Sequence, residues 1–295
     1  MSAIPDACAT RRGPIRLRFA ALILLAIALI PACASRIAPT PENTPARVLF
    51  VGNSLTYVGN TPAIYAALAK ANGHPVTADM IVRGGATLTQ RVADGSVAAA
   101  LETGKYTALV LQERGGDLMC AFGPASCVES RAALNVLAGL GRQHGVSVIL
   151  LGSYQPHPAA SRELVDAEAA AAQAVGIPYV EICQTLQALR SQAPDLSWFA
   201  ADGMHPGPHL ALLNAVRVHQ TLHHTLPAPA ALTITAPIYD VRSGLTETLR
   251  PADAPPPLPD TPLQTNHPAA TLDRLLDAIR QGARSNPPET PTPRP

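Results

Sequence analysis

The chain has 295 residues and a formal net charge of +1, and aromatic residues make up only 4% of it. That length allows one large domain or two small ones. The near-neutral charge and the scarcity of aromatic rings argue against a nucleic-acid-binding protein, which would carry a basic surface, so no nucleic-acid partner is expected.

Residues 1–34 have the pattern of an export signal. Four arginines precede an apolar run over residues 19–30, which is too short to span a bilayer comfortably and matches the core of a signal peptide. Two cleavage sites are open. A cut before Cys33 would give a lipid-anchored protein, because the preceding run resembles a bacterial lipobox, whereas a cut after Ala34 would give a soluble exported one. We favour the lipoprotein, with residues 35–45 as a tether, and expect a cell-envelope or periplasmic location in which only this anchor touches the membrane.

From residue 46 the chain alternates short apolar runs with segments of helical periodicity. Strands are expected at residues 48–51, 76–82, 108–111, 146–151 and 177–182. Helices are expected at residues 62–71, 88–101, 130–144, 162–174, 185–191 and 209–224. This alternation predicts an α/β domain over residues 46–225, a three-layer sandwich whose five-stranded parallel sheet carries helices on both faces.

The composition changes after residue 225. Residues 226–295 hold half of the chain's 30 prolines, which predicts a Pro-rich extension rather than more α/β structure. Leucine and isoleucine at helical spacing predict one short helix over residues 271–281. Residues 231–249 could add a strand or two to the edge of the domain, and the tail from Asn286 is expected to be disordered.

The first candidate functional residue is Ser54. It follows the apolar run 48–51 after Gly52 and Asn53, and a helix start at Thr61-Pro62 comes soon after. Ligands bind outside the carboxyl ends of the strands in open parallel sheets. Ser54 is therefore placed where a nucleophile would stand.

A second candidate group lies about 150 residues later, in the loop that contains Asp202 and His205. The two are three positions apart, so one tight turn can present both side chains to the same place. A serine nucleophile needs a base that takes its proton and an acid that orients that base. The pair supplies both.

These motifs resemble those of the SGNH (GDSL-type) serine hydrolases. Gly52-Asn-Ser54-Leu matches the first block, Gly85-Ala-Thr87 the second, and Asp202-x-x-His205-Pro the last, while the Leu-Gln-Glu run ending at Glu113 resembles one branch of the family. The resemblance implies the flavodoxin-like fold of that family, with Ser54 as nucleophile, His205 as base and Asp202 as its partner. It also implies an oxyanion hole made by the N–H groups of Ser54 and Gly85 and the side-chain amide of Gln112, where the family has an asparagine. Asn53 replaces the usual first-block aspartate.

The implied activity is that of an exported serine esterase without a cofactor. The expected substrate is a small ester or an acylated carbohydrate, with an O-acetyl group on a cell-envelope glycan as the leading choice. An O-acetyltransferase differs only in the nucleophile that resolves the acyl-enzyme, and a non-catalytic binder of acylated glycans is the non-enzymatic alternative. The sequence leaves the oligomeric state open.

Cysteines and histidines offer further candidate chemistry. Cys120 and Cys127 enclose a turn-rich loop and are expected to form a disulfide in an oxidising envelope, whereas Cys183 is expected to be a small core residue. A metal site at Asp202, His205 and His209 is the competing chemistry, but the Pro-Gly-Pro run between the two histidines breaks the regular turn that would align them. No metal is therefore expected.

Overall fold

The structure is a computed structural model that describes residues 46–155 and 157–285, all within the compact unit Pro45–Pro295. The predicted signal at residues 1–34, Cys33, the tether at residues 35–45 and the tail from Asn286 lie outside the described residues. In the described ranges, no helix combines the length and the apolar character that crossing a membrane requires.

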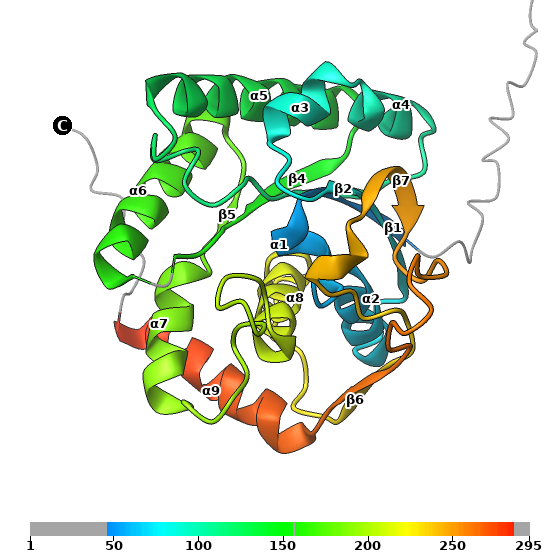
Figure 1. The fold of residues 1–295 in the computed structure, drawn as a ribbon, viewed down its shortest axis with the longest axis vertical. Coiled ribbons are helices and arrows are strands. Elements are labelled where there is room, and N and C mark those ends of the chain that lie inside the picture. Colours follow the sequence, from blue (N-terminus) through cyan, green and yellow to red (C-terminus); the bar gives the residue numbers. More distant parts are fainter. Residues whose placement is uncertain (1–45, 156, 286–295) are drawn as a thin grey trace, which may run out of the picture. The chain divides into compact units, whose positions relative to one another are not determined.

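A six-stranded sheet forms the middle of the fold (Figure 1). Its strands lie in the order β5-β4-β3-β1-β2-β7, and all neighbours are parallel except β7, which runs antiparallel to β2. The strands are β1 (Ala46–Gly52), β2 (Val76–Arg83), β3 (Ala108–Leu111), β4 (Ser147–Leu151), β5 (Tyr179–Val180) and β7 (Thr246–Pro251). The predicted α/β class and the five parallel strands are confirmed, and the sixth strand comes from the C-terminal extension.

Helices cover both faces of this sheet, as the alternation of strands and helices predicts. They are α1 (Ser54–Tyr57), α2 (Thr61–Ala71), α3 (Leu88–Ala93), α4 (Ser96–Glu102), α5 (Pro124–Gln143), α6 (Pro158–Val175), α7 (Cys183–Gln192), α8 (Pro208–His223) and α9 (Ala269–Ser285). The expected helix 88–101 is divided into α3 and α4 at Gly95, whose φ of 69° is a left-handed conformation that glycine adopts without strain.

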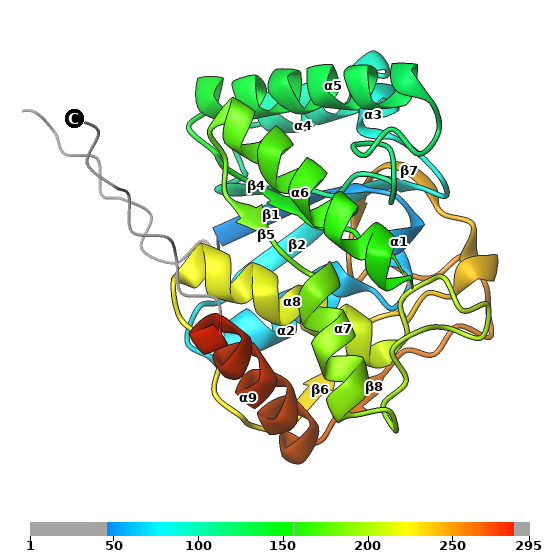
Figure 2. The ribbon, with the colours of Figure 1, turned by 90° about the vertical axis from the view of Figure 1, so that its left-hand side faces the viewer.

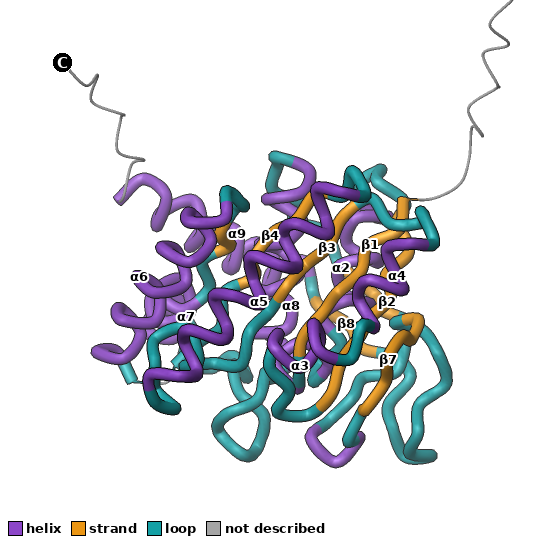
Figure 3. Tube along the Cα trace, turned by 90° about the horizontal axis from the view of Figure 1, so that it is seen from above, coloured by secondary structure: helices purple, strands orange, loops and turns teal. Residues whose placement is uncertain are grey.

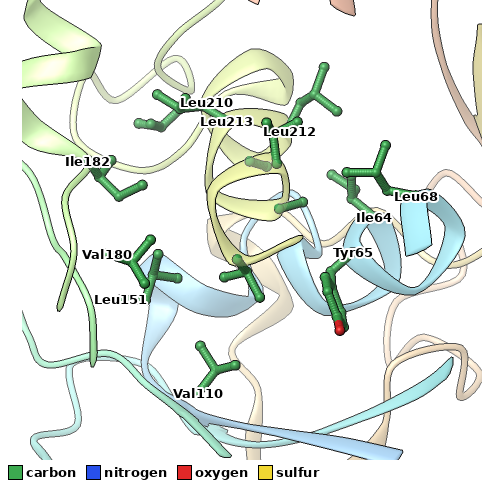
Figure 4. Close-up of a cluster of buried hydrophobic side chains, with 14 of the residues drawn as sticks. Ile64, Tyr65, Leu68, Val110, Leu151, Val180, Ile182, Leu210, Leu212 and Leu213 are labelled. Carbon is green, nitrogen blue, oxygen red and sulfur yellow. The ribbon is translucent and has the colours of Figure 1, made fainter. Parts of the chain in front are cut away.

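Successive residues of the strands point to opposite faces and so build two cores. Leu49 and Val51 of β1 pack with α3, α4 and α5, whereas Val48 and Phe50 pack with α2, α7 and α8. Figures 2 and 3 show α5 lying across one face of the sheet, and Figure 2 shows α8 and α2 on the other. Figure 4 shows part of the second core, where side chains from the sheet meet those of α2 and α8.

The described part of the C-terminal extension packs against the α/β domain and forms part of the same compact unit. Besides β7, it forms a two-stranded antiparallel sheet from β6 (Leu232–Ile234) and β8 (Thr265–His267). Asn60, at the start of α2, links the extension to the rest of the domain. The side-chain amide of Asn60 donates hydrogen bonds to the carbonyls of Pro237 (2.7 Å) and Ala252 (2.9 Å).

The predicted helix at residues 271–281 lies within α9. Its apolar stripe is buried in the second core at Leu272, Leu275, Leu276 and Ile279. The composition of the chain therefore changes at residue 225, but the residues on either side of it share one hydrophobic core.

Candidate active site

Ser54 is the first residue of α1, which begins two residues after the carboxyl end of β1 at Gly52. Asn53 caps α1 by accepting a hydrogen bond from the Leu55 N–H (3.0 Å), and its amide donates to the carbonyl of Ala86 (3.2 Å). Gly52 must be a glycine, because an added Cβ would lie 2.2 Å from Thr56 Oγ1. Within the described residues the Ser54 N–H has no acceptor, which leaves it free to bind a ligand.

Gly85 lies in the loop that follows β2, the strand beside β1. Its φ of 67° belongs to the left-handed region, where a side chain would be strained. Like that of Ser54, its N–H lacks an acceptor in the described part of the chain. The Asn53 side chain bonds to the carbonyl of Ala86, the residue after Gly85. One side chain therefore links the segments that carry the free N–H groups of Ser54 and Gly85.

Asp202 and His205 are joined in the loop between α7 and α8. Asp202 Oδ2 lies 2.6 Å from His205 Nδ1, and its Oδ1 accepts hydrogen bonds from the backbone N–H groups of Met204 (2.9 Å) and His205 (3.0 Å). Burial raises the pKa of Asp202, but the backbone N–H groups of His205 and Met204 and the imidazole outweigh it and bring the pKa to about 2. The carboxylate is therefore charged at neutral pH and fixes the orientation of the ring.

One pocket of about 510 Å³ brings these groups together. Ser54, Gly85 and His205 all line it. Much of the remaining wall consists of Leu55, Arg114, Phe122, Tyr154 and Met204. In the described residues no hydrogen bond joins Ser54 Oγ to His205, and such contacts are often long before a substrate binds. The arrangement offers a hydroxyl, an oriented imidazole and two free N–H donors at one place.

Gln112 does not line this pocket, and its hydrogen bonds in the structure are not those expected of an oxyanion donor. The side chain is buried, its amide donates to the Gly152 carbonyl (3.2 Å), and its Oε1 accepts from Thr56 Oγ1 (2.8 Å). The structure thus uses Gln112 to bind the turn after Ser54 to the end of β4. Its strand-end position was predicted correctly, but the direction of its side chain depends on these two distant partners.

Glu113 has a similar structural role on the other side of β3. It is buried and accepts hydrogen bonds from the N–H groups of Leu88 (3.1 Å) and Arg114 (2.8 Å). Burial raises the pKa of Glu113 to about 7. The Gln-Glu pair therefore positions the loops that carry Ser54 and Gly85.

The loop after β3 supplies wall residues that the sequence did not identify. A disulfide joins Cys120 to Cys127 and closes the loop that carries Phe122. The guanidinium of Arg114 lies 4.0 Å from the centre of the Phe122 ring. The only signal in the sequence was that Arg114 comes three residues after an expected strand end. Cys183 is buried with a free thiol, and burial raises its pKa.

The described histidines other than His205 lie outside this pocket. His209 Nδ1 accepts from the Ser197 N–H (3.0 Å) rather than joining Asp202 and His205. His223 stacks on His74 with ring centres 4.2 Å apart, and the ring of His219 lies tilted against His223 at 4.7 Å. Across the described ranges, no three histidine, cysteine or acidic side chains are grouped to hold a metal ion.

Comparison with known proteins gives the fold a name. No family model matches the chain, and no curated protein is similar to it in sequence. A proposed SGNH hydrolase from Slackia heliotrinireducens is similar in structure, with 23% identity and a TM-score of 0.50 over 61% of this chain and 100% of that one. A DUF4886 family protein from Bacteroides uniformis matches at 18% identity and a TM-score of 0.47, over 62% and 84% of the two chains. A variant of an acetyl-xylooligosaccharide esterase from Geobacillus matches at 15% identity and a TM-score of 0.48, over 60% of this chain and 94% of that one. The chain has the fold of an SGNH hydrolase.

Proposed function

We propose that this protein is a serine esterase that removes small acyl groups, with O-acetyl as the leading choice. The observation that carries the proposal is the shared pocket of Ser54 and His205, in which Asp202 fixes the imidazole from behind. A protein that only binds its ligand would not need a serine, a histidine and an aspartate in this arrangement. The two free N–H donors beside the serine add to the support.

The reaction follows from the positions of these groups. His205 Nε2 takes the proton of Ser54 as Oγ attacks the ester carbonyl, and the carbonyl oxygen becomes an oxyanion held by the N–H groups of Ser54 and Gly85. The tetrahedral intermediate collapses, the C–O bond to the alcohol breaks, and His205 returns its proton to the leaving oxygen. Water, deprotonated by the same imidazole, then attacks the acyl-enzyme. The C–O bond to Ser54 Oγ breaks, His205 returns the proton to Oγ, and the acid is released. Asp202 stays ionised throughout.

Labelling with a fluorophosphonate tests the nucleophile directly. The probe should modify Ser54 alone, and Ser54→Ala should lose both the label and the hydrolysis of p-nitrophenyl acetate. Ser96→Ala is the matched control, because Ser96 also begins a short helix but lies outside the pocket. A label on another residue, or full activity in Ser54→Ala, would refute the proposal.

We also propose that the protein is exported to the cell envelope as a lipoprotein. The sequence of residues 1–34 supports export, and the disulfide between Cys120 and Cys127 suits an oxidising compartment. Mass spectrometry of the mature N-terminus checks this, since the expected chain starts at Cys33 with a lipid attached. An unmodified start at Ser35 would show a soluble exported protein instead.

A further inference from the structure

A second hollow of about 380 Å³ adjoins the catalytic pocket. The two share Gly85, Arg114 and Phe122 as walls, so they border each other at Gly85, and we call the two together the groove. Most of the surface of the catalytic pocket is apolar, whereas the walls of the second hollow include several hydroxyl, amide and carboxyl groups from α3, α5 and the loop after β3. An ester placed across Gly85 would therefore have its two ends in different surroundings.

Arg114 is fixed between the two hollows. Its Nε and Nη2 donate to the buried carboxylate of Asp117 at 2.8 and 2.9 Å, and the face of the guanidinium lies on Phe122. This pairing leaves Nη1 without a partner among the described residues, and Arg114 lines both hollows. A planar donor held from two sides has little rotational entropy to lose when it binds a ligand oxygen.

The charges of the second hollow favour a neutral ligand. Asp117 neutralises Arg114, and Glu129, which forms no ion pair in the described part of the chain, adds one negative charge. The remaining polar wall groups are uncharged, namely Thr87, Thr89, Gln90, Ser126 and Ser130. An anionic ligand would be repelled by Glu129. Thr87, Gln90 and Ser126 already form hydrogen bonds within the protein. Among the described residues this leaves Nη1 of Arg114 and the hydroxyl of Thr89 as the groups of this wall that a neutral, hydroxyl-rich ligand can pair with.

Phe122 supplies the apolar surface of the hollow. Its side chain is 57% exposed, although a large aromatic ring is normally buried, and the disulfide loop holds it at the edge of the groove. An exposed ring face beside hydroxyl and amide groups matches a pyranose, which has an apolar C–H face and a rim of hydroxyl groups. A fatty alcohol has the first of these features but not the second.

We propose that the second hollow binds the neutral, hydroxyl-rich alcohol part of the ester, so that the substrate is an acylated sugar. This inference rests on the proposed esterase function. The acyl group lies in the catalytic pocket, the scissile bond lies at Gly85, and the adjoining sugar ring stacks on Phe122 with Arg114 donating to its hydroxyl groups.

The kinetic test compares an acetylated cellotriose with p-nitrophenyl acetate, which is too small to fill the second hollow. Ala125 lines this hollow but not the catalytic pocket, so Ala125→Trp fills it from α5. The ratio of kcat/KM for the sugar ester to that for p-nitrophenyl acetate should fall about tenfold or more in Ala125→Trp. Val136→Trp places the same ring at an exposed position farther along α5 and should leave the ratio unchanged. An unchanged ratio in Ala125→Trp would overturn the inference.

A binding measurement separates this inference from the proposed function. Unacetylated cellotriose should bind to Ser54→Ala in calorimetry and lose its affinity when Ala125→Trp is added, whether or not the protein hydrolyses esters. A protein that cleaves p-nitrophenyl acetate but binds no cellotriose would overturn the inference alone. Tighter binding of trigalacturonic acid than of cellotriose would also overturn it, because the ligand would then be anionic.

Discussion

Replacing Asp202 by asparagine is expected to lower kcat for a short-chain ester by on the order of 10⁴-fold while the fold is retained. In the native loop Oδ2 accepts the proton of His205 Nδ1 at 2.6 Å, which leaves Nε2 unprotonated and able to act as a base. An asparagine amide at Oδ2 would donate to Nδ1, stabilise the opposite tautomer and place a proton on Nε2. It would also remove the charge that stabilises the imidazolium formed during attack.

Asp195→Asn is the matched control for this prediction. Asp195 is also an exposed aspartate in the segment between α7 and α8, and it pairs with Arg274 at 2.9 Å. Its neutral variant should keep full activity, because it does not line the pocket. If Asp202→Asn retained more than about a tenth of the activity, the carboxylate would have no orienting role, and His205 would need another partner.

Replacing Glu168 by alanine is expected to lower the free energy of unfolding by about 3 kcal/mol, with urea denaturation as the measurement. Glu168 of α6 is buried and accepts hydrogen bonds from the Ser153 N–H (3.0 Å), the Ser153 hydroxyl and the Tyr179 hydroxyl (2.9 Å). Alanine would leave all three donors buried without an acceptor and would open a cavity. Ser153, which would lose its hydrogen bonds to Glu168, directly precedes Tyr154 and Gln155, which line the catalytic pocket.

Glu168→Gln isolates the effect of charge from that of shape. Burial raises the pKa of Glu168 to about 7 from an ordinary value of 4.5, so the folded protein keeps this proton at pH values where the unfolded chain has lost it. Between pH 4.5 and 7 the unfolded state binds fewer protons, and the wild-type protein therefore loses stability as the pH rises. Glutamine removes this dependence, so the variant should gain stability relative to wild type over that window and show no further gain above it. Glu163→Gln, a substitution at an exposed position of the same helix, is the control and should have the same dependence of stability on pH as the wild type. If the stability of Glu168→Gln also changed with pH as that of the wild type does, the raised pKa of Glu168 would be contradicted.

The sequence by itself determined the elements whose signals are local. The apolar run ending at Gly52 places Ser54 at the end of a strand, and the spacing of Asp202 and His205 allows one turn to join them, because both depend on residues a few positions apart. The periodicity of residues 271–281 likewise predicted a helix that the structure contains in α9. That helix was expected in an extension, however, and what buries its apolar stripe is a surface formed by other parts of the chain.

The tertiary structure decided the features that need a partner far away in sequence. β7 joins the sheet because the edge of β2 is open to it, and nothing within residues 246–251 specifies that edge. Gln112 faces Thr56 and Gly152 instead of the pocket, since a buried amide is most stable where both its donor and its acceptor are paired. The groove beside Gly85 exists because a disulfide and the bond from Arg114 to Asp117 hold Phe122 at its edge. A strand end fixes where a side chain begins, but the groups that pair with it across the fold fix where it points.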